Sequence, residues 1–324
     1  MSALRLVFLA DSHLGFDSPQ RPRVKRRRRG DDFFSNYLRA LDCADRDNVD
    51  AVIHGGDLFH RSEASFDLAS RAAAPLLSLA ERGIDVLIVP GNHERSRLPR
   101  PLLFVHPRVH VFDRPKTIVL SKRGLRLALS GAPFFRRCGE EIAATLARSR
   151  WREAEADVRL LCLHQALEGA RVGAHNFTFH RGHDVIAREQ IPSTFRAVLS
   201  GHIHRHQILG GDPHPPVLYC GSVERTAFAE RHEQKGFMRI DLGKEQISWR
   251  FIALPARPMR MIDTSALPQS KSSQARYLRQ RIAALEADAI VALRGQVEAR
   301  ILLSASEIRA LGPKTMNFAL ARSR

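Results

Sequence analysis

The sequence has no long apolar run and few cysteines. No segment reaches the roughly 18 consecutive apolar residues that mark a membrane-spanning helix. None of the four cysteines (Cys43, Cys138, Cys162 and Cys220) sits in a C-x-x-C pair, which argues against a zinc–thiolate site and favours free thiols in a reducing compartment. Residues 1–10 are too short for a signal peptide, so we expect a first strand and a cytoplasmic protein. Internal repeats and low-complexity tracts are also absent.

Positive charge, in contrast, is abundant. The chain of 324 residues carries 51 Lys and Arg against 34 Asp and Glu, a net charge of +17. Such a basic surface favours a polyanionic partner, most simply nucleic acid, although charge alone also fits an ordinary solvated surface. The basic loop at 21–29, which contains Lys25–Arg29, has two interpretations. It is either a solvated run or a loop that contacts phosphate.

The first ninety residues alternate between strand and helix patterns. Apolar runs at 4–10, 51–54 and 84–89 predict buried strands, while residues 31–47 and 64–82 predict the helices between them. Strands that alternate with helices pair in parallel, and their chemistry lies at the carboxyl ends. The order therefore predicts an α/β arrangement.

After residue 108 the pattern changes to short strands with turns between them. A helix is predicted at 139–150, and strands at 109–112, 116–121, 125–130, 158–163, 196–200, 217–220, 236–241 and 246–252. We expect an α/β (α+β) fold over residues 1–252, in which a two-sheet β-sandwich is flanked by helices.

The last seventy residues have a different composition. Proline, serine and lysine at 253–274 predict a linker, and residues 275–324 predict a small α+β domain. Its expected elements are helices at 274–287 and 304–311 and strands at 289–294, 297–303 and 315–322. A domain of this size is marginal alone, so we expect it to pack on the main domain.

Side chains that bind metals follow five of the predicted strands. The segments are Asp11-Ser12-His13, Gly56-Asp57, Gly91-Asn92-His93, His164 and Gly201-His202-Ile203-His204. Each motif alone is weak, because an Asp at a strand end usually makes a turn. Mixed imidazole and carboxylate ligands suit Mn, Fe or Zn. Together the segments supply enough ligands for two ions, the number that can promote an in-line phosphoryl displacement.

In this order the segments resemble the calcineurin-like metallophosphoesterases, whose pattern runs D-x-H, G-D, G-N-H-[DE], H and G-H-x-H. The resemblance implies two metal-ligand sets, Asp11, His13 and His204 for one ion and Asn92, His164 and His202 for the other. It also implies that Asp57 bridges the two ions. His93 would then stabilise the transition state and protonate the leaving oxygen.

Within that superfamily the local sequence is most similar to the SbcD-type double-strand-break-repair nucleases. The likeness rests on D-x-H-L-G at 11–15, G-D-L-F-H at 56–60 and G-S-x-E-R-x-x-F-x-E at 221–230. It implies that His60 contacts the scissile phosphate and that the C-terminal part resembles a shortened DNA-capping domain. The implied activity is a DNA exonuclease or endonuclease in repair, with two divalent ions, Mn²⁺ first and Fe or Zn as alternatives.

Two other functions remain open. One is a phosphodiesterase or phosphatase of the same fold that acts on nucleotides or other phosphoesters. The other is a DNA-binding scaffold subunit with weak catalysis. The family's partner, an SMC-like ATPase, uses a long C-terminal helical extension that we do not find in the sequence, and a homodimer is a further alternative.

The loop that follows His164 is rich in histidine. His175, His180 and His183 lie in its span of 168–183. Such residues either touch substrate or belong to a mobile loop, and we expect the second.

Overall fold

The computed structural model describes residues 3–19, 24–95, 98–99, 102, 106–295 and 301–319. It contains two compact units. The large unit comprises the residues up to Phe16 together with Asp32–Arg225 and Glu233–Pro255, and the small unit comprises Asp17–Asp31, Thr226–His232 and the chain from Ala256 onward. Across the described ranges, no helix combines the length and hydrophobicity needed to span a membrane.

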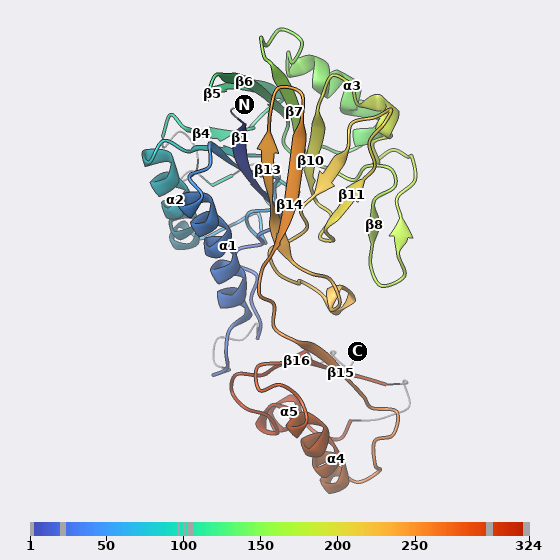
Figure 1. The fold of residues 1–324 in the computed structure, drawn as a ribbon. Helices are drawn as coiled ribbons and strands as arrows, with labels where there is room; N and C mark the ends of the chain where they lie inside the picture. Colours follow the sequence, from blue (N-terminus) through green and yellow to red (C-terminus); the bar gives the residue numbers. More distant parts are fainter. Residues whose placement is uncertain are drawn as a thin grey trace. The chain divides into compact units, whose positions relative to one another are not determined.

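The first sheet of the large unit has the strand order β14-β13-β1-β2-β3-β4 (Figure 1). Strands β1 to β4 pair in parallel, whereas β13 and β14 are antiparallel additions on the other side of β1. The strands are β1 (Leu4–Leu9), β2 (Ala51–His54), β3 (Asp85–Ile88), β4 (Val109–Val111), β13 (Gly236–Leu242) and β14 (Ile247–Ala253), and the helices of this half are α1 (Arg29–Arg46) and α2 (Phe66–Glu81).

The second sheet has the order β11-β12-β10-β7-β6-β5. Its four inner strands are parallel, and its two edge strands are antiparallel to their neighbours. The strands are β5 (Lys116–Lys122), β6 (Leu125–Gly131), β7 (Val158–His164), β10 (Ala197–Gly201), β11 (Gln207–Leu209) and β12 (Val217–Tyr219). Helix α3 (Cys138–Arg148), the short hairpin β8 (Arg171–Val172) and β9 (Phe177–Thr178), and the 3-10 turn Arg188–Gln190 complete this half.

Alternation along the strands builds the layers. On β1, Leu6 and Phe8 belong to the apolar core that the two sheets share, whereas Val7 and Leu9 belong to the core beneath α1 and α2. Successive side chains of a strand point to opposite faces, so a central strand covered on both faces is apolar throughout. A third core lies between the second sheet and α3. The predicted two-sheet sandwich flanked by helices is therefore confirmed.

The small unit has its own sheet and core. Strand β16 (Ile290–Arg294) lies between β15 (Met259–Asp263) and β17 (Asn317–Ala319), with all pairs parallel, and α4 (Lys271–Ala283) and α5 (Ala305–Ala310) complete the unit. The 3-10 turn Phe228–Glu230 also belongs to it. The stretch predicted as a linker, 253–274, contains β15 and the start of α4. The strand predicted near 297–303 falls largely outside the described residues.

Part of the basic loop is built into the small unit. The Arg26 guanidinium donates to the carbonyl oxygens of Met316 at 2.9 Å and Gly312 at 3.1 Å, at the end of the turn after α5. The Asn317 side chain donates to the Arg27 carbonyl at 2.9 Å. These contacts hold the loop to the unit, so its described part is not simply a solvated run.

Candidate metal centre

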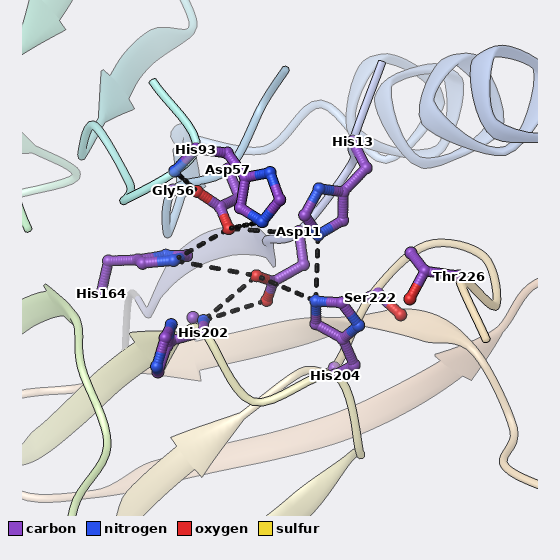
Figure 2. Close-up of polar contacts among 12 residues, drawn as sticks. Asp11, His13, Gly56, Asp57, His93, His164, His202, His204, Ser222 and Thr226 are labelled. Carbon is purple, nitrogen blue, oxygen red and sulfur yellow. Dashed lines mark hydrogen bonds and ion pairs between the residues drawn. The ribbon is translucent and has the colours of Figure 1, made fainter. Parts of the chain in front are cut away.

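The five sequence segments meet at one place in the large unit (Figure 2). The first sheet supplies Asp11, His13, Asp57, Asn92 and His93 from the loops that follow β1, β2 and β3. The second sheet supplies His164 at the end of β7, and His202 and His204 after β10. Because the carboxyl ends of parallel strands lie at one edge of a sheet, two facing sheets bring all these side chains together.

The backbone of this cluster is unusual. Asp11, His13, Asp57 and His202 have positive φ values of 50°, 43°, 52° and 82°. Residues other than glycine rarely adopt positive φ values, and backbone strain of this kind is concentrated at functional sites. These conformations could not be predicted from the local sequence pattern.

Glycines make room where chains approach closely. A Cβ at Gly56, whose φ is +105°, would lie 2.2 Å from His164 Nδ1, and one at Gly91 would lie 2.1 Å from Asp57 Oδ1. Only glycine leaves the space that these two side chains occupy. The Gly-Asp and Gly-Asn-His motifs therefore have a steric reason.

One group of donors consists of Asp11, His13 and His204. The Nε2 atoms of the two histidines lie 2.9 Å apart, and His204 Nε2 lies 3.9 Å from Asp11 Oδ1. Both oxygens of Asp11 accept the backbone N–H of His202, at 3.1 and 3.2 Å. Burial and the neighbouring His204 hold the pKa of His13 well below its usual value, so His13 is a neutral imidazole, the form that binds metals.

The other group consists of Asn92, His164 and His202. Asn92 Oδ1 lies 3.1 Å from His164 Nε2 and 3.0 Å from His202 Nδ1. His164 Nδ1 lies 2.7 Å from the Gly55 carbonyl oxygen, to which it donates, and this contact aims Nε2 into the cluster. Burial and the charge of His164 lower the pKa of His202 to about 3.

Asp57 lies between the two groups. Its Oδ2 is 3.3 Å from His164 Nε2 and 4.0 Å from His13 Nε2, and its Oδ1 accepts the His93 backbone N–H at 2.9 Å. Burial alone would raise the pKa of Asp57, but the charge and hydrogen bond of His164 hold it well below its usual value. Burial would likewise lower the pKa of His164, but Asp57 and Asp11 raise it to about 9.

Two histidines lie beside the cluster. His93 Nδ1 lies 2.7 Å from the His60 carbonyl oxygen, its Nε2 is 3.9 Å from Asp57 Oδ2, and its side chain is 34% exposed. His60 Nδ1 is buried and has no hydrogen-bond partner among the described residues, while its ring lies edge-on to Phe16 with centroids 5.1 Å apart. Burial and His93 lower the pKa of His60.

Glu94 and Lys235 support the cluster from outside and were not singled out by sequence reasoning. Glu94 accepts the backbone N–H groups of Phe59 at 2.6 Å and Gly91 at 2.8 Å, and burial beside Asp57 raises its pKa to about 8. The buried Lys235 ammonium donates to the His204 carbonyl at 2.9 Å. Glu94 lies within the G-N-H-[DE] pattern, whereas a lone lysine carries no comparable signal.

The donor set fits divalent metal ions. In two triads, Asp11 with His13 and His204, and Asp11 with Asp57 and His164, all ligand atoms lie within 4.8 Å of one another. Asn92 and His202 extend the second triad through the Asn92 amide oxygen. Two facing imidazole nitrogens and two buried carboxylates make poor mutual partners without a cation, and this mixture suits Mn, Fe or Zn.

The fold and this cluster define a metal-dependent phosphoester hydrolase. Residues 4–206 match the family model described as calcineurin-like phosphoesterase, and the chain belongs to that family. The predicted resemblance is confirmed at this level. The family indicates a dinuclear metal site, although the identity of the metal does not follow from it.

Several known proteins are similar to the chain. An uncharacterized metallophosphoesterase of Bacillus subtilis, YhaO, is 27% identical over 78% of this chain and 60% of its own length. A DNA double-strand break repair protein Mre11, of Methanopyrus kandleri, is 24% identical over 81% of this chain and 60% of its own length. A solved dimetal phosphatase of Danio rerio has 13% identity and a TM-score of 0.49, covering 76% of this chain and 95% of that one. The chain thus spans about 60% of the length of these two sequence relatives.

Proposed function

We propose that the protein is a two-metal phosphodiesterase that cleaves DNA phosphodiester bonds, as an exonuclease or endonuclease in repair. The observation that carries the proposal is the position of Asp57, whose carboxylate faces both donor groups at once. Asp11, His13 and His204 would hold one ion and Asn92, His164 and His202 the other, with Asp57 shared. When bound, the two ions would activate water and neutralise charge on the phosphate.

The residues beside the cluster supply the remaining chemistry. His93 Nδ1 donates to the His60 carbonyl, which leaves Nε2 to carry a proton toward a leaving oxygen. A general acid must be reachable from the substrate. The His93 side chain is 34% exposed and can be reached, whereas the proposed metal ligand Asp57 is only 3% exposed. His60 lies next to it, with ring centroids 5.3 Å apart, in a position to contact a phosphate.

The choice of DNA as substrate has two supports. The G-D-L-F-H segment at 56–60 and the G-S-x-E-R segment at 221–225 are similar to repair nucleases, and relatives named Mre11 match most of the chain. A net charge of +17 favours a polyanion over a small phosphoester with one or a few negative charges. Mn²⁺ is the proposed ion, and DNA, an SMC-like ATPase and a second copy of the chain are the proposed partners.

The test is metal-dependent degradation of linear duplex and single-stranded DNA by the purified protein, with bis(p-nitrophenyl) phosphate as a small diester. We expect DNA cleavage with Mn²⁺ and none with a chelator, and we expect Asp57→Asn to lose cleavage of every substrate. Small-diester hydrolysis without DNA cleavage would reject the nuclease and favour a phosphodiesterase of smaller substrates. Full DNA cleavage by Asp57→Asn would reject the proposed metal centre.

A further inference from the structure

The histidine-rich loop after His164 folds into a defined hairpin. Strands β8 and β9 pair with Arg171 opposite Thr178 and Val172 opposite Phe177. The turn between them closes with Asn176 N–H donating to the Gly173 carbonyl at 3.3 Å, and both residues have positive φ, 54° and 71°. Glycine and asparagine are the residues that adopt this conformation most readily. The loop therefore contains a two-stranded hairpin, which the sequence pattern did not predict.

The hairpin is anchored to the segment that carries His204. Arg205, the next residue, donates to the Gly173 carbonyl at 2.7 Å and to the Asn176 side chain at 2.6 Å. The same guanidinium is paired with Glu233 at 3.0 Å.

Gln207, two residues after Arg205, provides a second anchor for the hairpin. The Gln207 side chain, on β11, exchanges two hydrogen bonds of 2.8 Å with the backbone of Arg171, at the start of β8. The Arg205 side chain thus connects the turn of the hairpin directly to the segment that carries His204.

The hairpin displays an aromatic ring. Phe177 is 62% exposed, although burying such a side chain would stabilise the fold. Its ring rests edge-on against Phe179, with centroids 5.3 Å apart and an interplanar angle of 86°. Phe179 in turn packs on the core beneath the second sheet. Phe177 is therefore an exposed ring that contacts a neighbour anchored in the core.

The surroundings of Phe177 are basic. Arg171, His175, His180 and Arg181 are all exposed on the hairpin and its return. Arg181 pairs with Glu189 at 3.2 Å, whereas Arg171, His175 and His180 have no acidic partner among the described residues. An exposed aromatic ring beside arginine side chains is the combination that binds unpaired bases by stacking and their backbone by charge.

We propose that the β8–β9 hairpin is a binding surface for a nucleic-acid strand with unpaired bases, with Phe177 as a stacking platform and Arg171 as a phosphate contact. The inference rests on the proposed function, because it assigns to the nuclease the strand that it grips beside the metal centre. Stacking tolerates any base, so the surface distinguishes unpaired from paired strands rather than one sequence from another.

The test compares the binding of fluorescein-labelled oligothymidine and of a blunt duplex by fluorescence anisotropy, with a chelator present so that no cleavage occurs. Stacking of one base on an aromatic ring corresponds to about a tenfold change in Kd. We expect Phe177→Ala and Phe177→Leu to weaken oligothymidine binding about tenfold, with duplex binding changed less than about twofold. Phe177→Tyr keeps an aromatic face and should bind as the parent does. Arg171→Glu should weaken the binding of both oligothymidine and the duplex.

A matched control is Phe66→Ala, which removes another exposed phenylalanine, 78% exposed at the start of α2. It should leave oligothymidine binding unchanged. Unchanged binding by Phe177→Ala, an equal loss of both probes, or an equal loss in Phe66→Ala would overturn the proposal. The nuclease assay is separate: if the parent cleaves DNA while Phe177→Ala binds normally, the surface fails and the nuclease stands. If the parent does not cleave DNA but Phe177→Ala selectively loses oligothymidine binding, the nuclease proposal fails and the binding surface stands.

Discussion

The base of the metal centre and its rim are built differently. At the base, Asp11, Asp57 and His164 are at most 3% exposed in their side chains, and each has a hydrogen bond to the backbone of another segment. At the rim, the His93 side chain is 34% exposed, and His60 is partly buried. Buried carboxylates and imidazoles suit metal ligation, and a partly exposed imidazole can reach a substrate. The base would therefore hold the ions and the rim would serve the reaction.

The largest loss of cleavage without loss of metal is expected from a substitution at the rim. His93→Ala removes the proposed proton donor without removing a proposed ligand, so DNA cleavage should fall by about 10²- to 10⁴-fold. Bound manganese per chain, measured by mass spectrometry after gel filtration, should stay at the parent level. Loss of metal together with activity would move His93 from the rim to the base. His60→Ala should also keep both ions but impair cleavage less.

The base can also be disturbed by a substitution at a residue that is not itself a proposed metal ligand. In Gly91→Ala the new methyl group would lie 2.1 Å from Asp57 Oδ1, so the carboxylate must move. A displacement of about 1 Å costs on the order of 10²-fold in rate, and we expect that loss in steady-state cleavage, with weaker manganese binding. Gly210→Ala is the matched control, since a Cβ there meets no atom within 4 Å. Normal cleavage by Gly91→Ala would show that the base tolerates movement.

Lys235 tests whether backbone support matters to the base. Its ammonium is buried, donating to the His204 carbonyl and to Glu233 at 2.9 Å. Lys235→Met removes the cation from the His204 carbonyl, while Glu233 keeps its pair with Arg205, and supporting groups of this kind are worth about 10- to 100-fold in metal affinity. Manganese titration should show that loss, whereas Lys244→Met, at a lysine that is 69% exposed, should not. Equal affinities would limit the role of Lys235 to folding.

The smallest effect is expected far from both base and rim. The buried Tyr37 hydroxyl donates to the Ala72 carbonyl at 2.8 Å, which joins α1 to α2. Tyr37→Phe should lower the free energy of unfolding by about 1 kcal/mol, measured by urea denaturation. Its cleavage rate and metal content should match the parent. A change in either would show that the helices on the first sheet influence the centre.

Much of this arrangement could be predicted from the sequence, for a physical reason. Strands such as β1, β2 and β7 are buried on both faces over most of their length, so they are mainly apolar, and polar residues follow at Asp11, Gly55 and His164. Because both sheets place their carboxyl ends at one edge, the polar residues that follow such strands were expected to converge. The two-sheet fold follows from the same pattern.

Other features depend on contacts between distant segments. Strand β15 is short, follows Pro258, and pairs with β16 some thirty residues later, so its stretch was predicted as a linker. The β8–β9 hairpin is held in place by Arg205 and Gln207, which lie far along the chain. Local sequence patterns do not contain such long-range partners.

If Asp57 is shared by two metal ions, its removal must weaken the binding of both, and the metal stoichiometry of the protein shows whether it does. Equilibrium dialysis against Mn²⁺, followed by mass spectrometry, should give two ions per chain for the parent. Asp57→Asn, which keeps the size of the side chain but not its charge, should bind neither ion tightly. Two tightly bound ions in Asp57→Asn, or a single ion in the parent, would contradict the account.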